Sequence, residues 1–539
     1  MVRNVLWVVL LGCCFSFLGV QAANHVLYGN YDSKWSINAY DINFDFFASA
    51  LDNHLALGED DYENDEFFSF EYFGNLDFVY SDLPSGDIFF HTKYQRFGRS
   101  EYAANLTNVK TTGTQIIQDY LDPLRALPKV YELSFGAPLF KGFRVQAGLH
   151  KPHRVGWTGY LFGDKLPNYG VTLSYVHPFS SSSLATNFRW DKPNLNNKWN
   201  LEIERPDSHT NEGWFDVHAH RFLFDTAYAW KTHYVQAFVS YVLDHTKNDH
   251  RQIRFFDNLT VDKDQLGNAG LSLMFSNWHG NIMLDAARNF GYIYNTNSAS
   301  NAGGQGKPRI DHEGYMGAAS VTWNAHTVVL PTFKFMYFSG GGTTSTDVDA
   351  GNTNFQTRNE SYSIVSPANT FLSTSTAEEL LGLGYASGGM HTLWYGISRP
   401  NWNVGGADTK SNLAATTLNL NFSIHDDLIF MLDYWYMYIL KPGYRRARQA
   451  SGTLETVKNS HDHGSFVDLT LIYKWSDHLR LGFLGNLFLP GKYHDQHRNI
   501  DTITGTRQDG DVLEFAPVTN NRGDAKNAWV GQAYFTYSF

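Results

Sequence analysis

Apolar and polar residues alternate one by one along much of this chain. In the segment Phe143–Leu149 every odd position is apolar, whereas Arg144, Gln146 and Gly148 take the even positions. Successive side chains of a β-strand point to opposite faces, so this period of two predicts strands with one apolar and one polar face. Segments of the same kind lie at 68–72, 88–97, 169–176, 217–230, 235–243, 317–323, 327–338, 418–424, 428–438, 469–473 and 479–487. Most approach the length of about 9–11 residues with which a tilted strand crosses a bilayer.

The connectors between these segments are of two kinds. Some are short and polar, such as Ala325-His326 and His425–Asp427, whereas others are long and rich in Gly, Ser, Thr and Asn, the longest being about Ser339–Glu379. Bacterial barrels have short periplasmic turns and long extracellular loops. We therefore predict an all-β fold, a single transmembrane antiparallel β-barrel of about 18 strands, with 16–20 possible. It is expected to begin after about residue 30 and to end at Phe539, with Ser339–Glu379 outside the cell.

Composition favours a membrane protein. Aromatic residues make up 16% of the chain, yet the mean hydropathy is −0.34. Beyond residue 22 no apolar run reaches the roughly 18 residues that a transmembrane helix needs. Many aromatics without long apolar runs fit barrel strands with aromatic girdles at both interfaces. Composition alone also allows a large soluble β-sandwich or propeller.

The N-terminal residues resemble an export signal. Arg3 gives a small positive charge, Val5–Leu18 is apolar, and Ala22 ends a Val-Gln-Ala sequence suited to cleavage. We expect a signal peptide at 1–22 and the barrel at 23–539. There are two alternatives for this segment. One is a transmembrane helix, and the other is a lipoprotein signal, because Leu10–Cys13 resembles a lipobox. Both cysteines of the chain precede residue 23, so residues 23–539 can form no disulfide and no thiolate metal site.

The C-terminal residues form one more alternating segment. Aromatic or small residues occupy every second position from Trp529 to Phe539. A final amphipathic strand that ends in Phe is similar to the assembly signal of outer-membrane proteins. It predicts that Phe539 lies on the lipid face, that the barrel-assembly machinery is a partner during insertion, and that the protein resides in the outer membrane, with its lipid as a second partner.

Several stretches, taken together in their order, resemble the alginate-export family of outer-membrane porins. The first runs from Val130–Leu133 through Phe162–Asp164 to Tyr169–Leu173, the second is Leu428–Tyr436 after a polar turn, and the third is Asp468–Tyr493 with its Phe-Leu-Pro-Gly-Lys-Tyr end. The resemblance implies a porin that passes a polysaccharide. The chain departs from the family at Gly148–His150, where members tend to carry a Gly-Arg-Gln-like sequence.

The alternation also assigns faces to charged residues. A Lys or Arg on the lipid face of a strand is costly, so cations between bulky apolar neighbours are expected to point into the barrel. The candidate pore-lining residues are Lys93, Arg144, Arg189, Arg221, Lys334, Lys474 and Arg480. A cationic lumen would select anionic solutes. Alternatively, these cations pair with inner carboxylates such as Asp225, Asp433 and Asp468 and brace the wall.

Other chemistry is weakly indicated. The chain has 22 His, of which the pairs His218/His220 and His461/His463 could bind a metal only with further ligands that no spacing supplies. Asp347 and Asp349 give just two carboxylates for a calcium site. The sequence lacks G-x-S-x-G, P-loop and H-E-x-x-H motifs, and we expect no enzyme activity, cofactor or metal.

The function that these patterns predict is passive transport. The formal net charge of −11 in an exported chain argues against nucleic-acid binding. We expect an outer-membrane channel, porin-like, for selective passage of a hydrophilic and anionic solute such as an oligo- or polysaccharide. The alternative is a structural sheath or surface-binding barrel around a partner protein, without an open channel.

Overall fold

The structure is a computed structural model of the chain. It describes residues 25–28, 34–52, 65–81, 83, 86–100, 129–150, 155–158, 168–192, 219–244, 261–295, 309–324, 328–339, 360–361, 413–440, 444–448, 454–458, 460–493 and 527–538. The expected signal peptide, Phe539 and most of Ser339–Glu379 lie outside these ranges. Within them, no helix has both the length and the apolar character to cross a membrane.

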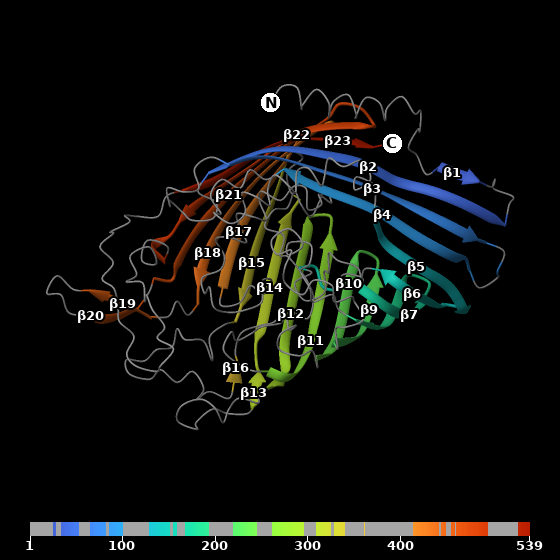
Figure 1. Cartoon of the computed structure of the whole chain (residues 1–539), viewed down its shortest axis with the longest axis horizontal. Helices are drawn as coiled ribbons and strands as arrows, with labels where there is room; N and C mark the ends of the chain where they lie inside the picture. Colours follow the sequence, from blue (N-terminus) through green and yellow to red (C-terminus); the bar gives the residue numbers. More distant parts are fainter. Residues whose placement is uncertain are drawn as a thin grey trace.

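Antiparallel strands close into a ring. The ring consists of β2 (Trp35–Asp52), β3 (Asp65–Tyr80), β4 (Ile88–Ser100), β5 (Lys129–Phe140), β6 (Phe143–His150), β7 (Asn168–Pro178), β8 (Ser182–Lys192), β9 (Ala219–Trp230), β10 (His233–Asp244), β11 (Val261–Asn277), β12 (Gly280–Asn295), β14 (Tyr315–Trp323), β15 (Val329–Phe338), β17 (Leu413–His425), β18 (Leu428–Ile439), β21 (Asp462–Lys474), β22 (Leu479–Pro490) and β23 (Ala528–Ser538). Each pairs with the next, and β23 returns to β2 from Asn43↔Ser538 to Asp52↔Trp529. Figure 1 shows this seam, where β2 and β3 run beside β22 and β23.

The expected all-β antiparallel barrel is thus present. The pairings of the described residues lead through eighteen strands and back to the first. The whole sheet has 21 strands, above the expected 16–20, because the short β1 (His25–Tyr28), β13 (Arg309–His312) and β16 (Glu360–Ser361) add to its margins. A separate hairpin is formed by β19 (Tyr444–Arg448) and β20 (Leu454–Lys458).

Burial alternates along the strands as the sequence pattern predicts. In β12, Leu284 and Phe290 are exposed, whereas Asp285 and Asn289 are buried. The same alternation places large exposed apolar side chains on strands around the ring, among them Phe90, Phe135, Phe188, Phe224, Val239, Leu271, Val321, Phe335, Leu418, Tyr434 and Phe483. Soluble proteins rarely expose a continuous apolar surface of this extent. The outer wall therefore has the character of a lipid-facing surface.

The tight turns lie together at one end of the ring. They connect β5 to β6, β9 to β10, β11 to β12, and β17 to β18. β23 also ends at this level, because its residue Tyr537 pairs with Leu479, which directly follows the β21–β22 turn. Four tryptophans mark the same end: Trp35, Trp278, Trp323 and Trp475 are 60–79% exposed. We call this the turn end. The connector from β15 to β17, which includes Ser339–Glu379, leaves from the opposite end.

We expect an arginine at mid-height of the outer wall to destabilise the barrel more than one at the turn end. Phe224 lies midway along β9 and Ile424 lies beside the β17–β18 turn, and both point outward. In lipid, Phe224→Arg should cost about 2–4 kcal/mol and Ile424→Arg about 0–1 kcal/mol. Denaturant unfolding in phospholipid vesicles measures both. Equal losses for the two variants would mean that the outer wall does not sit in a bilayer.

Candidate functional site

The seven candidate cations divide into two groups on the inner wall. Three are buried: Arg189 and Arg221 are each 1% exposed and Lys334 is 7% exposed. They alternate with outward aromatic side chains, as Lys334 does with Phe333 and Phe335. The other four are partly or fully accessible, namely Lys93, Arg144, Lys474 and Arg480.

The buried cations Arg189 and Arg221 share one carboxylate. Arg189 donates from Nε to Asp191 (2.5 Å), and Arg221 donates from Nε and Nη2 to the two Asp191 oxygens (2.9 and 2.8 Å). Arg189 also donates to the His150 ring nitrogen Nε2 (2.5 Å) and to the Thr172 hydroxyl (3.0 Å). Such a network holds strands β6–β9 together. This is the alternative in which inward cations pair with carboxylates and brace the wall. The carboxylate here is Asp191, which the sequence pattern did not single out.

The carboxylates that the sequence pattern did single out lie on the inner wall among amide side chains. Asp225 accepts hydrogen bonds from Asn187 (3.2 Å) and Gln236 (3.0 Å). Asp433 accepts one from Asn419 and lies opposite Asp468 in the β18–β21 pairing. All three carboxylates are buried. Amide side chains of neighbouring strands therefore donate to Asp225 and Asp433.

The accessible cations gather in the half of the barrel nearer the turn end. Arg144 is the second residue of β6 and lies over the Phe89 ring, 5.5 Å from its centroid. Arg480 is the second residue of β22 and pairs in register with Lys474. Lys474 forms an ion pair with Asp477 in the turn (2.8 Å), which lowers the pKa of that exposed carboxyl. Lys93 lies opposite Glu132 on the neighbouring strand.

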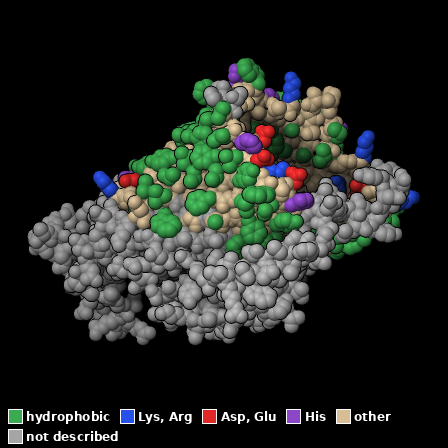
Figure 2. Space-filling view, turned by 90° about the horizontal axis from the view of Figure 1, so that it is seen from above, with side chains coloured by type: hydrophobic (Ala, Val, Ile, Leu, Met, Phe, Trp, Pro, Cys, Tyr) green, Lys and Arg blue, Asp and Glu red, His purple; other side chains and the backbone are tan. Residues whose placement is uncertain are grey.

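A polar cluster that the sequence did not indicate lies on the same inner wall. The Asp77 carboxylate is 2.6 Å from the ring nitrogen Nδ1 of His91 and accepts a hydrogen bond from the Tyr40 hydroxyl (3.0 Å). His91 is two positions from Lys93 and shares its face. These residues come from three strands, so their proximity depends on register. Figure 2 shows acidic, basic and histidine side chains gathered beside a recess of the molecule, with hydrophobic side chains over the neighbouring surface.

A segment between β6 and β7 contacts the inner faces of β10 and β12. The amides of Trp157 and Thr158 donate to the Asp285 carboxylate on β12 (3.3 and 2.9 Å), as does the Thr158 hydroxyl (2.7 Å). The Gly156 amide donates to Gln236 on β10 (3.1 Å). We call 155–158 the strap. The strap therefore lies inside the ring, against the inner wall. The contact joins residues 127 positions apart, and no local sequence signal marks it.

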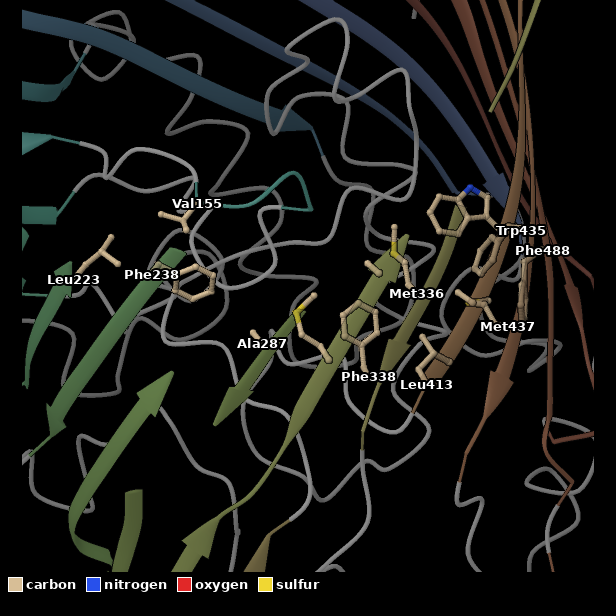
Figure 3. Close-up of a cluster of buried hydrophobic side chains, with 14 residues drawn as sticks. Val155, Leu223, Phe238, Ala287, Met336, Phe338, Leu413, Trp435, Met437 and Phe488 are labelled. Carbon is tan, nitrogen blue, oxygen red and sulfur yellow. The ribbon is translucent and has the colours of Figure 1, made fainter. Parts of the chain in front are cut away.

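Much of the remaining inner wall is apolar. Buried Met, Phe, Trp, Leu and Ala side chains form one cluster, which Figure 3 shows along the inner side of the strands: Val155, Leu223, Phe238, Ala287, Met316, Ala318, Met336, Phe338, Leu413, Ala415, Trp435, Met437, Phe466 and Phe488. Barrel interiors that conduct water are usually polar. The inner wall therefore combines buried charged side chains, such as Arg189, Lys334 and Asp433, with this apolar cluster.

We expect the shared carboxylate to be the most sensitive charged residue of the wall. Asp191→Asn would remove the carboxylate charge that two buried guanidiniums share, and losing one partner of a buried pair costs about 3–5 kcal/mol. Asp477→Asn, which removes the same charge from an exposed turn, should leave stability nearly unchanged. Denaturant unfolding measures both variants. Similar stabilities for Asp191→Asn and the parent protein would show that the network does not brace the wall.

Comparisons with known proteins give only distant likenesses. No protein-family model and no curated protein matches the chain. Among solved structures, a BenF-like porin from Pseudomonas fluorescens Pf-5 has a TM-score of 0.45 at 8% identity over 93% of this chain and 98% of that one. Pseudomonas aeruginosa OccK11 has a TM-score of 0.43 at 11% identity over 96% and 99%, and the outer membrane protein OprD from the same species has 0.42 at 7% over 97% of both chains. At this level the likeness assigns no family, and the resemblance to alginate-export porins stays a prediction.

Proposed function

We propose that the protein is an outer-membrane channel, porin-like, for passive and selective passage of a hydrophilic, anionic solute such as an oligo- or polysaccharide. The observation that carries the proposal is the closed ring with an apolar outer wall and charged groups inside. A bilayer has no water to satisfy an open sheet edge, so a closed ring is the form in which strands can span it.

The dimensions support insertion in a membrane. A strand rises about 3.3 Å per residue, so twelve tilted residues, the length of β9, β10 and β18, cover about 30 Å. This matches the hydrocarbon thickness of a bilayer, also about 30 Å. Exposed tryptophans at the turn end fit one membrane interface, where their amphipathic rings are stabilised.

The orientation follows from the same elements. We place the turn end in the periplasm and the long connectors outside the cell, as bacterial barrels do. Residues 1–22 would direct export, and Phe539 would be read by the barrel-assembly machinery on the lipid face of β23. In that strand Phe535 packs against Phe44 and Phe46 of β2, on the same phase as position 539.

The solute class rests on the accessible cations. Arg144, Arg480 and Lys474 have exposed side chains near the turn-end mouth, and Lys93 lies on the same inner face. Cations at a constriction favour anions. The resemblance to alginate-export porins adds an acidic polysaccharide as one such anion.

A second function is favoured by the apolar inner wall. Met437 and Phe488 have no exposed surface and Trp435 is 2% exposed, although all three point inward. An interior as closely packed as this fits the alternative of a structural sheath or surface-binding barrel without an open channel. The two functions differ in whether ions cross.

Ion conductance in planar bilayers tests the channel. We expect discrete channels from the purified protein and a larger conductance from Asp285→Ala, because that change removes the acceptor of three strap hydrogen bonds. Thr158→Val should increase conductance less. Thr322→Val, which removes an inner-wall hydroxyl bonded to Thr332 and not to the strap, is the matched control. A silent parent protein would favour the sheath.

Reversal potentials in a salt gradient test the anion preference. Replacing both Arg144 and Arg480 with Ala should reduce the preference for anions without loss of folding, and the preference should weaken in high salt, which screens charges. Arg288→Ala, which removes one positive charge from an exposed outward position, is the control for each of the two single replacements and should leave the reversal potential unchanged. If the double variant keeps the parent's reversal potential, these two arginines do not set selectivity.

A further inference from the structure

One arginine points to the outside of the barrel. In β12 the buried Ala287 and Asn289 face inward, and Arg288 between them is exposed on the side of Leu284 and Phe290. Among the described residues Arg288 has no hydrogen bond, ion pair or ring contact. The seven candidate cations alternate with outward apolar neighbours, whereas Arg288 shares the outward phase itself. A cation at such a position requires a partner from outside the chain or contact with water.

The height of Arg288 indicates what meets it. β12 begins at Gly280, directly after the β11–β12 turn, and Arg288 is eight positions further along it. With a rise of about 3.3 Å and a tilt of about 40°, this separation is about 20 Å along the barrel axis. The apolar band of outer-membrane barrels is about 25 Å tall, so Arg288 lies in the upper part of the band. From this height a long cationic side chain can extend to the lipid headgroups.

Two tyrosines stand beside it on the same face. Tyr315 is the register partner of Arg288 on β14, and its ring stacks with that of Tyr337 on β15, the centroids being 5.7 Å apart. Their hydroxyl oxygens are 3.4 Å apart. Arginine and phenolic hydroxyls are hydrogen-bond donors with the geometry that phosphate oxygens accept.

Towards the turn end the wall beneath these donors is shallow. Ala286 lies two positions from Arg288, and its register partner is Gly317. A Cβ built on Gly317 would meet nothing within 4 Å, so the surface is open there. Leu284 and Phe335 continue the same outward face on β12 and β15. An acyl chain that extends below a headgroup would lie over this surface.

We propose that Arg288, with the Tyr315 and Tyr337 hydroxyls, binds the phosphate of a phosphorylated glycolipid in the outer leaflet of the membrane. The proposal rests on the proposed outer-membrane location and orientation, not on channel activity. Charge complementarity selects this occupant: the site offers one cation and two hydroxyls within reach of the headgroups, in the half of the barrel away from the periplasmic turns. A second copy of the chain would instead have to bring an outward carboxylate to the same height.

Lipid binding in detergent tests the site. The probes are lipid A with both phosphates and the same lipid after removal of its phosphates, and native mass spectrometry measures the bound fraction. We expect the parent protein to bind the phosphorylated lipid and Arg288→Gln to bind it at least tenfold more weakly. Arg288→Lys should regain part of the affinity, and Tyr315→Phe should lose several-fold. Lys141→Gln, in the exposed β5–β6 turn, is the matched charge control and should bind like the parent protein.

Three results would overturn the site. The first is equal lipid affinity of Arg288→Gln and the parent protein, and the second is equal binding of the phosphorylated and the dephosphorylated lipid. The third is a change of oligomeric state in Arg288→Gln that does not depend on lipid, which would assign the surface to a second copy of the chain. A heat-induced gel shift shows whether each variant is folded. The bilayer recordings separate this proposal from the channel. A silent barrel with Arg288-dependent lipid binding rejects the channel alone, and a conducting barrel without it rejects the lipid site alone.

Discussion

Closure of the backbone hydrogen-bond ladder is the constraint on which the rest of this structure depends. A strand in lipid has no water to satisfy its N–H and C=O groups, so the pairing of β2 with β23 removes the two edges that the sheet would otherwise expose. Closure also gives each strand an inside and an outside. Whether a side chain points inward or outward then depends on whether its position in the strand is odd or even. A register slip of one residue would exchange the inward and the outward side chains.

The inner wall shows how a barrel handles charge away from bulk water. Two arginines share Asp191, and amide side chains donate to Asp225 and Asp433. These interactions tie neighbouring strands at a level where an unpaired charge would be costly. Charges that remain accessible, such as Arg144 and Arg480, lie nearer the turn end. The buried and the accessible residues of the same charge are therefore separated along the barrel axis.

The strap is bound to the inner wall in two ways. Val155 of the strap belongs to the same cluster as Leu223 and Phe238, so the segment is held by apolar packing as well as by Asp285. On the outside, Arg288 lies in the upper part of the apolar wall, from where a long cationic side chain can extend to the interface.

The sequence alone determined the strand pattern and the facing of the side chains. A period of two needs only local geometry, so Lys334 could be placed opposite Phe333 and Phe335 without knowledge of any neighbour. Which strand meets which, and in what register, was decided by the tertiary structure. Asp191 between two arginines, the Tyr40–Asp77–His91 cluster and the strap on Asp285 all join residues from separate strands. The alternation of apolar and polar residues cannot indicate these partners, because any inward residue of an adjacent strand is compatible with the same pattern. The pattern also does not distinguish Met437 and Phe488 from other strand residues, although closure of the ring makes them part of an apolar inner wall.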